Sequence, residues 1–171
     1  VQYRRLVPSV LSPGTLYIVS TPIGTLEDVT YRAVRVLGQV DLVAAEDTRR
    51  TTKLFAPYGI TTRRVSLHEH NEAKRIPSLL RRLSRGETVA VVSDAGTPLV
   101  SDPGARLVRA TLEEGHRVEA VPGPSAVLAA LAASGLAADG FTFVGFPPAR
   151  SKARKLWFSK LALQQRPVIF F

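Results

Sequence analysis

Apolar residues recur along the chain in short runs, separated by longer segments with a mixed, helix-like pattern. The short runs are rich in Val, Leu, Ile and Phe, which favours strands. We predict strands at Leu16–Val19, Leu42–Ala45, Val65–Leu67, Val89–Ser93, Val118–Val121, Phe141–Val144 and Val168–Phe171. Val89–Val92 is apolar at every position, which is typical of a strand covered on both faces.

The segments between these runs predict helices. Their expected bounds are Thr30–Leu37, Thr48–Tyr58, Ala73–Arg85, Ala105–Glu114, Ser125–Ala133 and Ala153–Gln164. Gly38, Gly59, Gly86 and Gly115 each follow one of them, where a left-handed residue commonly ends a helix. The alternation of strands and helices predicts an α/β fold with a mainly parallel sheet flanked by helices.

Composition and charge limit the classes of protein to which the chain can belong. A chain of 171 residues is long enough for a sizeable core. No apolar run approaches the ~20 residues of a membrane span, so we expect no membrane association. The chain has no cysteine, which excludes disulfides and thiolate metal sites and fits a cytoplasmic location. Its net charge of +9 favours a polyanionic partner, and we expect nucleic acid.

The basic residues gather in two stretches, Arg49–Arg85 and Arg150–Lys155. If they cluster near one cleft they form an RNA track; otherwise they are ordinary solvated charges. Aromatic platforms for single-stranded RNA are not recognisable, so any RNA contact is expected to rest on phosphates and shape.

Two loops that directly follow predicted strands form the candidate cofactor site. The first is Ser20–Gly24 and the second is Ser93–Gly104. In open α/β sheets, ligands bind where loops leave the carboxyl ends of the strands. Neither loop has the pattern G-x-G-x-x-G, and the chain has no G-x-x-x-x-G-K-[ST], so a nucleoside triphosphate site is not expected.

The polar residues of these loops allow two interpretations. The Asp94 carboxylate can accept hydrogen bonds from a ligand, Gly96 lets a ligand approach the backbone, and Thr97 offers a hydroxyl. The alternative is an Asp-x-Gly turn that only reverses the chain. Ser125 can likewise contact a cofactor directly or cap the helix that follows.

Two further polar runs follow predicted strands. Asp47 and Arg49 either position a proton acceptor and hold a phosphate, or cap the next helix. His68 and His70 lack a third nearby histidine or a cysteine, so we expect no metal site. His68 is then either a general base, because histidine titrates near neutrality, or an ordinary loop residue.

Five motifs, in order along the chain, resemble the ribosomal RNA small-subunit methyltransferase I family. They are Leu16–Asp28, Ala44–Arg49, Leu67–Glu72, Ser93–Gly104 and Pro122–Ala126. The resemblance spans Thr15 to Phe171 and implies a tetrapyrrole-methylase fold. It also implies S-adenosylmethionine-dependent 2′-O-ribose methylation of a cytidine in 16S ribosomal RNA.

The resemblance assigns roles to particular residues. The residues expected to bind S-adenosylmethionine are Pro22, Ile23, Asp94, Gly96, Thr97, Ser125 and Ala126. Asp47 and His68 are the candidate bases, and Arg49 is expected to orient a phosphate. The implied partners are 16S ribosomal RNA or the small ribosomal subunit, and a second copy in a homodimer. Two other functions stay open: methylation of a tetrapyrrole, which the basic charge and the Thr21–Gly24 form of the first loop disfavour, and a non-catalytic RNA-binding module.

We expect three segments along the chain. Residues 1–14 are predicted to be a flexible N-terminal arm, and 15–146 an N-terminal α/β methylase domain. Residues 147–171 are predicted to be a linker and the start of a truncated C-terminal domain. Pro147 and Pro148 disfavour helix and strand, and positive charge rises directly after them. Because the family's second domain supplies part of the cofactor pocket, the chain by itself need not be active.

Overall fold

The computed structural model describes residues 11–136 and 139–171. The chain divides into two compact units, Val1–Gly123 and Pro124–Phe171. The domain bounds 15–146 and 147–171 stay a prediction. Within the second unit, β6 (Thr142–Phe143) pairs in parallel with β7 (Val168–Ile169).

The first unit is built on a five-stranded sheet in which every pair is parallel. Its strands are β1 (Thr15–Val19), β2 (Leu42–Ala45), β3 (Arg64–Ser66), β4 (Val89–Val92) and β5 (Arg117–Val121). They lie in the order β3-β2-β4-β1-β5, so β4 separates β1 from β2. All four residues of β4 are buried, as its apolar run predicts. The predicted parallel α/β fold is confirmed.

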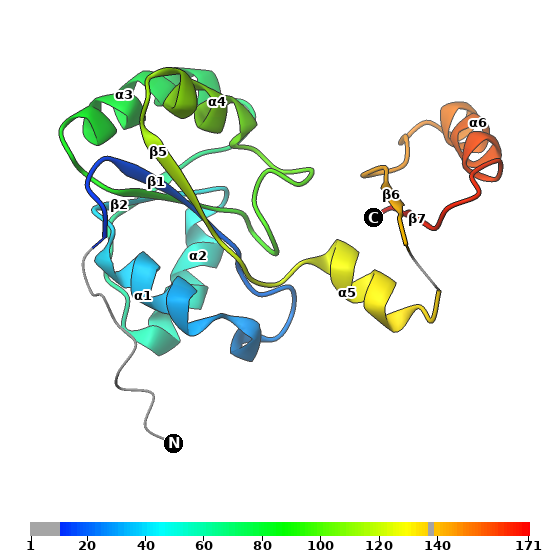
Figure 1. The fold of residues 1–171 in the computed structure, drawn as a ribbon, viewed down its shortest axis with the longest axis horizontal. Coiled ribbons are helices and arrows are strands. Elements are labelled where there is room, and N and C mark those ends of the chain that lie inside the picture. Colours follow the sequence, from blue (N-terminus) through cyan, green and yellow to red (C-terminus); the bar gives the residue numbers. More distant parts are fainter. Residues whose placement is uncertain (1–10, 137–138) are drawn as a thin grey trace. The chain divides into compact units, whose positions relative to one another are not determined.

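Helices cover both faces of this sheet (Figure 1). One face is covered by α1 (Tyr31–Gln39) and α2 (Thr48–Phe55), and the 3-10 turn η2 (Ala56–Tyr58) directly follows α2. The other face is covered by α3 (Glu72–Ser84) and α4 (Ala105–Glu113).

Each face has its own apolar core. On the first, Leu37 and Phe55 pack with Tyr17 and the strand residues beside it. On the second, Leu83 and Leu107 pack with their own set of strand residues. Each fully buried side chain of this size contributes about 1.5–3 kcal/mol of transfer free energy, so the two cores fix the sheet from both sides.

Some predicted bounds differ from the structure. Helix α1 runs through Gly38 to Gln39, so Gly38 does not end it. The reason is the next residue, Val40, whose side chain is buried and whose amide continues the helical hydrogen bonds to Val36. The other predicted helix-ending glycines have left-handed φ angles of 61°, 82° and 74°, at Gly59, Gly86 and Gly115. A short 3-10 turn, η1 (Leu26–Asp28), was not predicted.

The predicted N-terminal arm lies mostly outside the described residues. Its last residues are attached to the first unit. Leu11 packs against the core under α1 and α2. The amide of Gly14 donates to the carbonyl of Gly86 at 3.1 Å, and the amide of Ser12 donates to the Tyr17 hydroxyl at 3.1 Å.

The second unit holds α5 (Ala126–Ala133) and α6 (Ser151–Leu161) besides the β6–β7 pair. Strand register places Thr142 opposite Val168. Aromatic rings join α6 to the end of the chain, since Trp157 and Phe158 both make edge contacts with Phe170. Within the described residues, no helix combines the length and the apolar character that crossing a membrane requires.

Candidate functional site

The sheet changes winding direction between β1 and β4. These strands are neighbours, yet the helix after β1 covers one face and the helix after β4 covers the other. In open α/β sheets, such a reversal leaves a crevice at the carboxyl ends of the strands, where ligands bind. The two loops that sequence analysis singled out both leave the sheet here (Figure 1).

Direct hydrogen bonds join these two loops. Thr21 and Gly96 exchange backbone bonds of 2.9 and 3.0 Å, which form an isolated antiparallel bridge. The Ser20 and Thr97 hydroxyls lie 3.1 Å apart. Gly96 has φ 84°, a conformation that favours glycine, and both of its backbone polar groups face Thr21. The structure thus gives Gly96 a role in loop pairing, and its contact with a cofactor stays a prediction.

The carboxylates of Glu46 and Asp94 connect β2 to β4 beyond the ends of the strands. The Asp94 amide donates to Glu46 Oε2 at 3.1 Å, and the Asp47 amide donates to Asp94 Oδ1 at 3.1 Å. Arg50 Nη1 lies 3.4 Å from Asp94 Oδ2. Asp94 is therefore anchored by one amide and one guanidinium, which is more than a simple chain-reversing turn requires.

Asp47 is the N-cap of α2. Its Oδ1 accepts the Arg49 amide at 2.8 Å, and the Arg49 guanidinium reaches both of its oxygens. These hydrogen bonds, first of all the one from the Arg49 side chain, lower the pKa of Asp47 below its usual value. A carboxylate with a lowered pKa is a weaker base. The capping interpretation thus describes the structure, and it weakens the case for Asp47 as proton acceptor.

A pocket of about 310 Å³ opens between the first loop, α2 and the start of the second loop. Its volume is at the lower end of the ~300–1,000 Å³ range of small-molecule sites. The lining residues that sequence analysis predicted for a cofactor are Pro22, Ile23 and Asp94. Arg50 and Lys53 line its α2 side, so the pocket combines apolar side chains with both signs of charge.

A second cleft, of about 540 Å³, lies on the other side of the Glu46–Asp94 link. Its wall includes His68, Asp102 and Arg106. Burial raises the pKa of Asp102 above its usual value, and the negative charges of Glu46 and Asp94 raise it further. A carboxyl group with a raised pKa in a cleft is a candidate functional group. Asp102 lies within the predicted loop Ser93–Gly104 but was not predicted as a site residue, because burial and the crowding of negative charges cannot be read from local spacing.

The side chain of Asn71 holds His68 in place. Asn71 Oδ1 accepts the His68 amide at 2.9 Å, and Asn71 Nδ2 lies 3.0 Å from His68 Nε2. Because the same Nδ2 also donates to the Ser66 carbonyl, Asn71 is the donor and His68 Nε2 the acceptor. The hydrogen of a neutral ring is then on Nδ1, which is buried and has no partner among the described residues.

The loop between the two cavities carries backbone strain. Leu99 and Ser101 have φ angles of 72° and 65°, in the left-handed region that side chains other than glycine rarely adopt. Such residues cost about 1–3 kcal/mol each and gather at functional sites. The buried Glu72 carboxylate supports the end of this loop by accepting the Leu107 amide in the first turn of α4 at 3.0 Å.

The remaining predicted site residues lie in the second unit. Ser125 accepts the Leu128 amide at 3.4 Å and is the N-cap of α5, in which Ala126 is the first residue. Their contact with a cofactor stays a prediction. Within residues 11–136 and 139–171, no three His, Cys, Asp or Glu side chains come together as a metal site would require.

Comparison with known proteins places this geometry in a family. Residues 15–171 match the family model of Tetrapyrrole (Corrin/Porphyrin) Methylases. The chain belongs to the tetrapyrrole methylase family. Among the relatives of the chain are proteins named ribosomal RNA small subunit methyltransferase I. The one from Haemophilus influenzae is 51% identical over 158 residues, and the one from Escherichia coli O157:H7 is 50% identical over 160. These alignments cover 92% and 94% of this chain, and 56% of each relative.

Solved structures share the methylase fold. Uroporphyrin III C-methyltransferase from Thermus thermophilus in its native form is 27% identical, with a TM-score of 0.57 over 77% of this chain and 59% of that one. A second structure of that enzyme, complexed with S-adenyl homocysteine, is 25% identical, with a TM-score of 0.57 over 78% and 59%. Diphthine synthase has a TM-score of 0.65 over 92% and 63% at 16% identity, a likeness of fold alone.

Proposed function

We propose that the protein transfers a methyl group from S-adenosylmethionine to the 2′-hydroxyl of a cytidine in 16S ribosomal RNA. The observation that carries the proposal is the identity of about half of all residues, over more than nine-tenths of the chain, with proteins named ribosomal RNA small subunit methyltransferase I. The net charge of +9 supports a polyanionic substrate.

The crevice fits S-adenosylmethionine chemically. That molecule carries a sulfonium cation, and Glu46, Asp94 and Asp102 place three interacting carboxylates at the carboxyl edge of the sheet. The 310 Å³ pocket adds the apolar side chains of Pro22 and Ile23. When bound, S-adenosylmethionine supplies the methyl group, and these residues would hold and orient it.

The protein's own contribution to the reaction is alignment and proton removal. Holding the ribose hydroxyl in line with the methyl group can supply much of the acceleration. A base adds typically ~10²–10⁴-fold. Of the predicted bases, His68 is favoured over Asp47, because the lowered pKa of Asp47 weakens it as a proton acceptor. To take the hydroxyl proton, His68 Nε2 must first give up the hydrogen bond that it accepts from Asn71 Nδ2. Arg49 donates to Asp47 through Nε and Nη2, and its side chain is 89% exposed, which leaves Nη1 to orient a phosphate.

Methylation of a tetrapyrrole is the second candidate function. It is supported by the likeness to uroporphyrin III C-methyltransferase, at 27% identity. The higher identity to the ribosomal RNA methyltransferases and the basic charge favour RNA. We further propose a homodimer and a cytoplasmic location, both from the resemblance to the ribosomal RNA methyltransferase family.

The test is a substrate comparison with the product of the whole gene. It would be incubated with radiolabelled S-adenosylmethionine and either small ribosomal subunits lacking the modification or uroporphyrinogen. We expect label in 16S ribosomal RNA, and mass spectrometry of its nucleosides should find 2′-O-methylcytidine. Label in uroporphyrinogen alone would replace this proposal with the tetrapyrrole function. RNA binding without any transfer would indicate a non-catalytic module.

A further inference from the structure

Positive charge is distributed unevenly between the two compact units. The second unit, Pro124–Phe171, has six Lys and Arg residues and a single acidic one, Asp139. Its net charge is therefore +5 over 48 residues, whereas the 123 residues of the first unit carry +4. Such a concentration of one sign within a small unit indicates a polyanionic partner rather than a general solubility effect.

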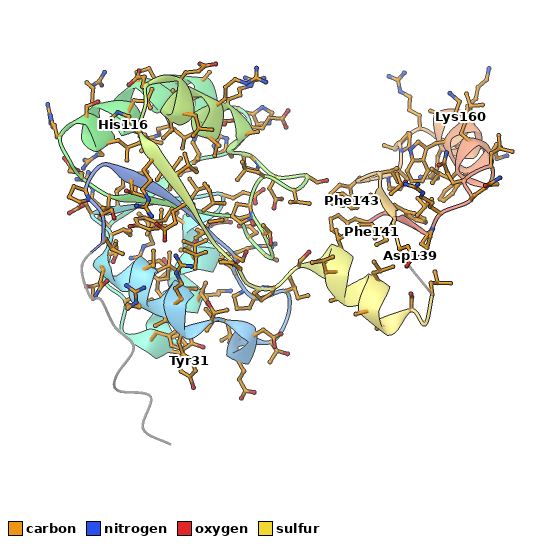
Figure 2. All side chains as sticks on the ribbon, viewed as in Figure 1. Tyr31, His116, Asp139, Phe141, Phe143 and Lys160 are labelled. Atoms are coloured by element: carbon orange, nitrogen blue, oxygen red, sulfur yellow. The ribbon has the colours of Figure 1, made fainter. Side chains whose placement is uncertain are left out.

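Helix α6 and the residue before it carry most of this charge. Five of the six basic residues lie there, namely Arg150, Lys152, Arg154, Lys155 and Lys160. The helix has no Asp or Glu, so no pair within it neutralises these charges. Figure 2 shows nitrogen-tipped side chains projecting from α6, Lys160 among them.

Packing separates α6 into two sides. Trp157 and Phe158 contact Phe170, which fixes one side of the helix to the end of the chain. With about 3.6 residues per turn, Lys152 lies opposite these rings, and Lys155 and Lys160 lie on either side of Lys152, each about 110° from the middle of the ring side. All three lysines are exposed, and none forms an ion pair with any residue that the structure describes.

The spacing of these lysines suits an extended anion. Lys152 and Lys155 are one turn apart, and Lys160 is eight residues after Lys152, about 12 Å along the axis. We propose that the outer side of α6, formed by Lys152, Lys155 and Lys160, binds the phosphate backbone of the RNA substrate. This inference rests on the proposed function and names the surface through which the substrate is held.

The physical basis is counterion release. A lysine that neutralises a phosphate frees a condensed cation, so affinity falls with salt in proportion to the number of such contacts. For single-stranded RNA, each contact contributes about 0.7 to the slope of log affinity against log salt. Three contacts through α6 therefore contribute about 2 to that slope.

The experiment uses two variants of the whole gene product that change charge equally. One is Lys152→Gln, Lys155→Gln and Lys160→Gln in α6. The matched control is Lys74→Gln, Arg81→Gln and Arg85→Gln, three exposed basic residues on or just after α3. Affinity for a fluorescent single-stranded RNA would be titrated over a range of salt concentrations, and thermal unfolding would show that both variants fold as the wild type does.

We expect the α6 variant to lose about 2 from the salt slope and at least tenfold in affinity at low salt, and the α3 control to lose much less. Equal losses of affinity and salt slope in the two variants would show that net charge alone explains the effect, and would overturn the inference. So would an unchanged slope in the α6 variant while the wild type binds and methylates RNA. A wild type that neither binds nor methylates RNA would overturn the proposed function as well.

Discussion

The backbone amide of Asp47 donates to the carboxylate of Asp94 across 3.1 Å, which ties the end of β2 to the end of β4. Arg50 lies 3.4 Å from the other oxygen of the same carboxylate. Asp94 therefore has a structural role and faces the 310 Å³ pocket as well. Mutations can separate these two roles, because the amide of asparagine keeps an acceptor oxygen and loses the charge.

Asp94→Ala should weaken binding of S-adenosylmethionine roughly ten- to hundredfold, as expected for a lost charge-assisted hydrogen bond of ~1.5–3 kcal/mol. Asp94→Asn should keep the bond from Asp47 and the wild-type unfolding temperature, yet still bind the cofactor more weakly. Calorimetric titration of both variants measures this. If both variants bound S-adenosylmethionine with wild-type affinity, Asp94 would only link the ends of β2 and β4 and would not bind the cofactor.

His68→Ala should slow methyl transfer about 10²–10⁴-fold and leave the affinities for cofactor and RNA unchanged, since a base acts on the chemical step. Asp47→Asn should slow it less than tenfold, because asparagine still caps α2 and the carboxylate is a weak base. Single-turnover kinetics compares the two. If the larger loss belonged to Asp47→Asn, the roles proposed for these residues would be reversed; if neither variant were slower, alignment alone would carry the reaction.

Gly123→Ala should destabilise the first unit by about 1–3 kcal/mol through overpacking. A Cβ at this position would lie 2.9 Å from the Cβ of Ser20, closer than such atoms approach. Gly24→Ala is the matched control, since a Cβ there meets nothing within 4 Å, and its unfolding free energy should change by less than ~0.5 kcal/mol. Chemical denaturation should find that Gly123→Ala costs much less in a Ser20→Gly background than in the wild type, a comparison that cancels the loss of the Ser20–Thr97 hydrogen bond. An equal cost in both backgrounds would show that this contact is not the cause.

Asp102→Asn should raise stability at neutral pH. Burial and nearby negative charge raise the pKa of Asp102 in the folded state above its usual 3.8, so ionisation costs more in the folded than in the unfolded state. This unfavourable contribution is absent below pH 3.8 and grows as the pH rises through the raised pKa. The variant should therefore gain stability over the wild type above that pH and match it in strong acid. Unfolding curves measured from acid to neutral pH test the sign, and a variant less stable at neutral pH would contradict it.

Local sequence pattern was sufficient for the sheet and insufficient for the polar contacts between segments. The run Leu42–Ala45 predicts β2 at the observed bounds, because a strand buried on both faces is apolar throughout. The link between Glu46 and Asp94 joins residues 48 positions apart, and no local spacing encodes it. The support that Glu72 gives to the start of α4 is hidden for the same reason.

The boundary between the units depends on pairing in the same way. Pro147 and Pro148 marked a break in secondary structure, and that break lies inside the second unit because Thr142 pairs with Val168 beyond it. Gly38 shows the limit of single-residue rules, since burial of Val40 outweighs the tendency of glycine to end a helix.

The place of β4 between β1 and β2 has a consequence for how the chain folds. The first two strands are consecutive in sequence but do not pair with each other, because both pair with residues 89–92, which lie between them. During synthesis β1 therefore stays without a strand partner while three α-helices and two further strands emerge before β4. Strand pairs between residues so far apart in sequence form slowly, and the strand edges stay exposed until they form. Pulsed hydrogen exchange during refolding should find that amides of Leu16 and Ala44 become protected together with those of β4, as one cooperative step.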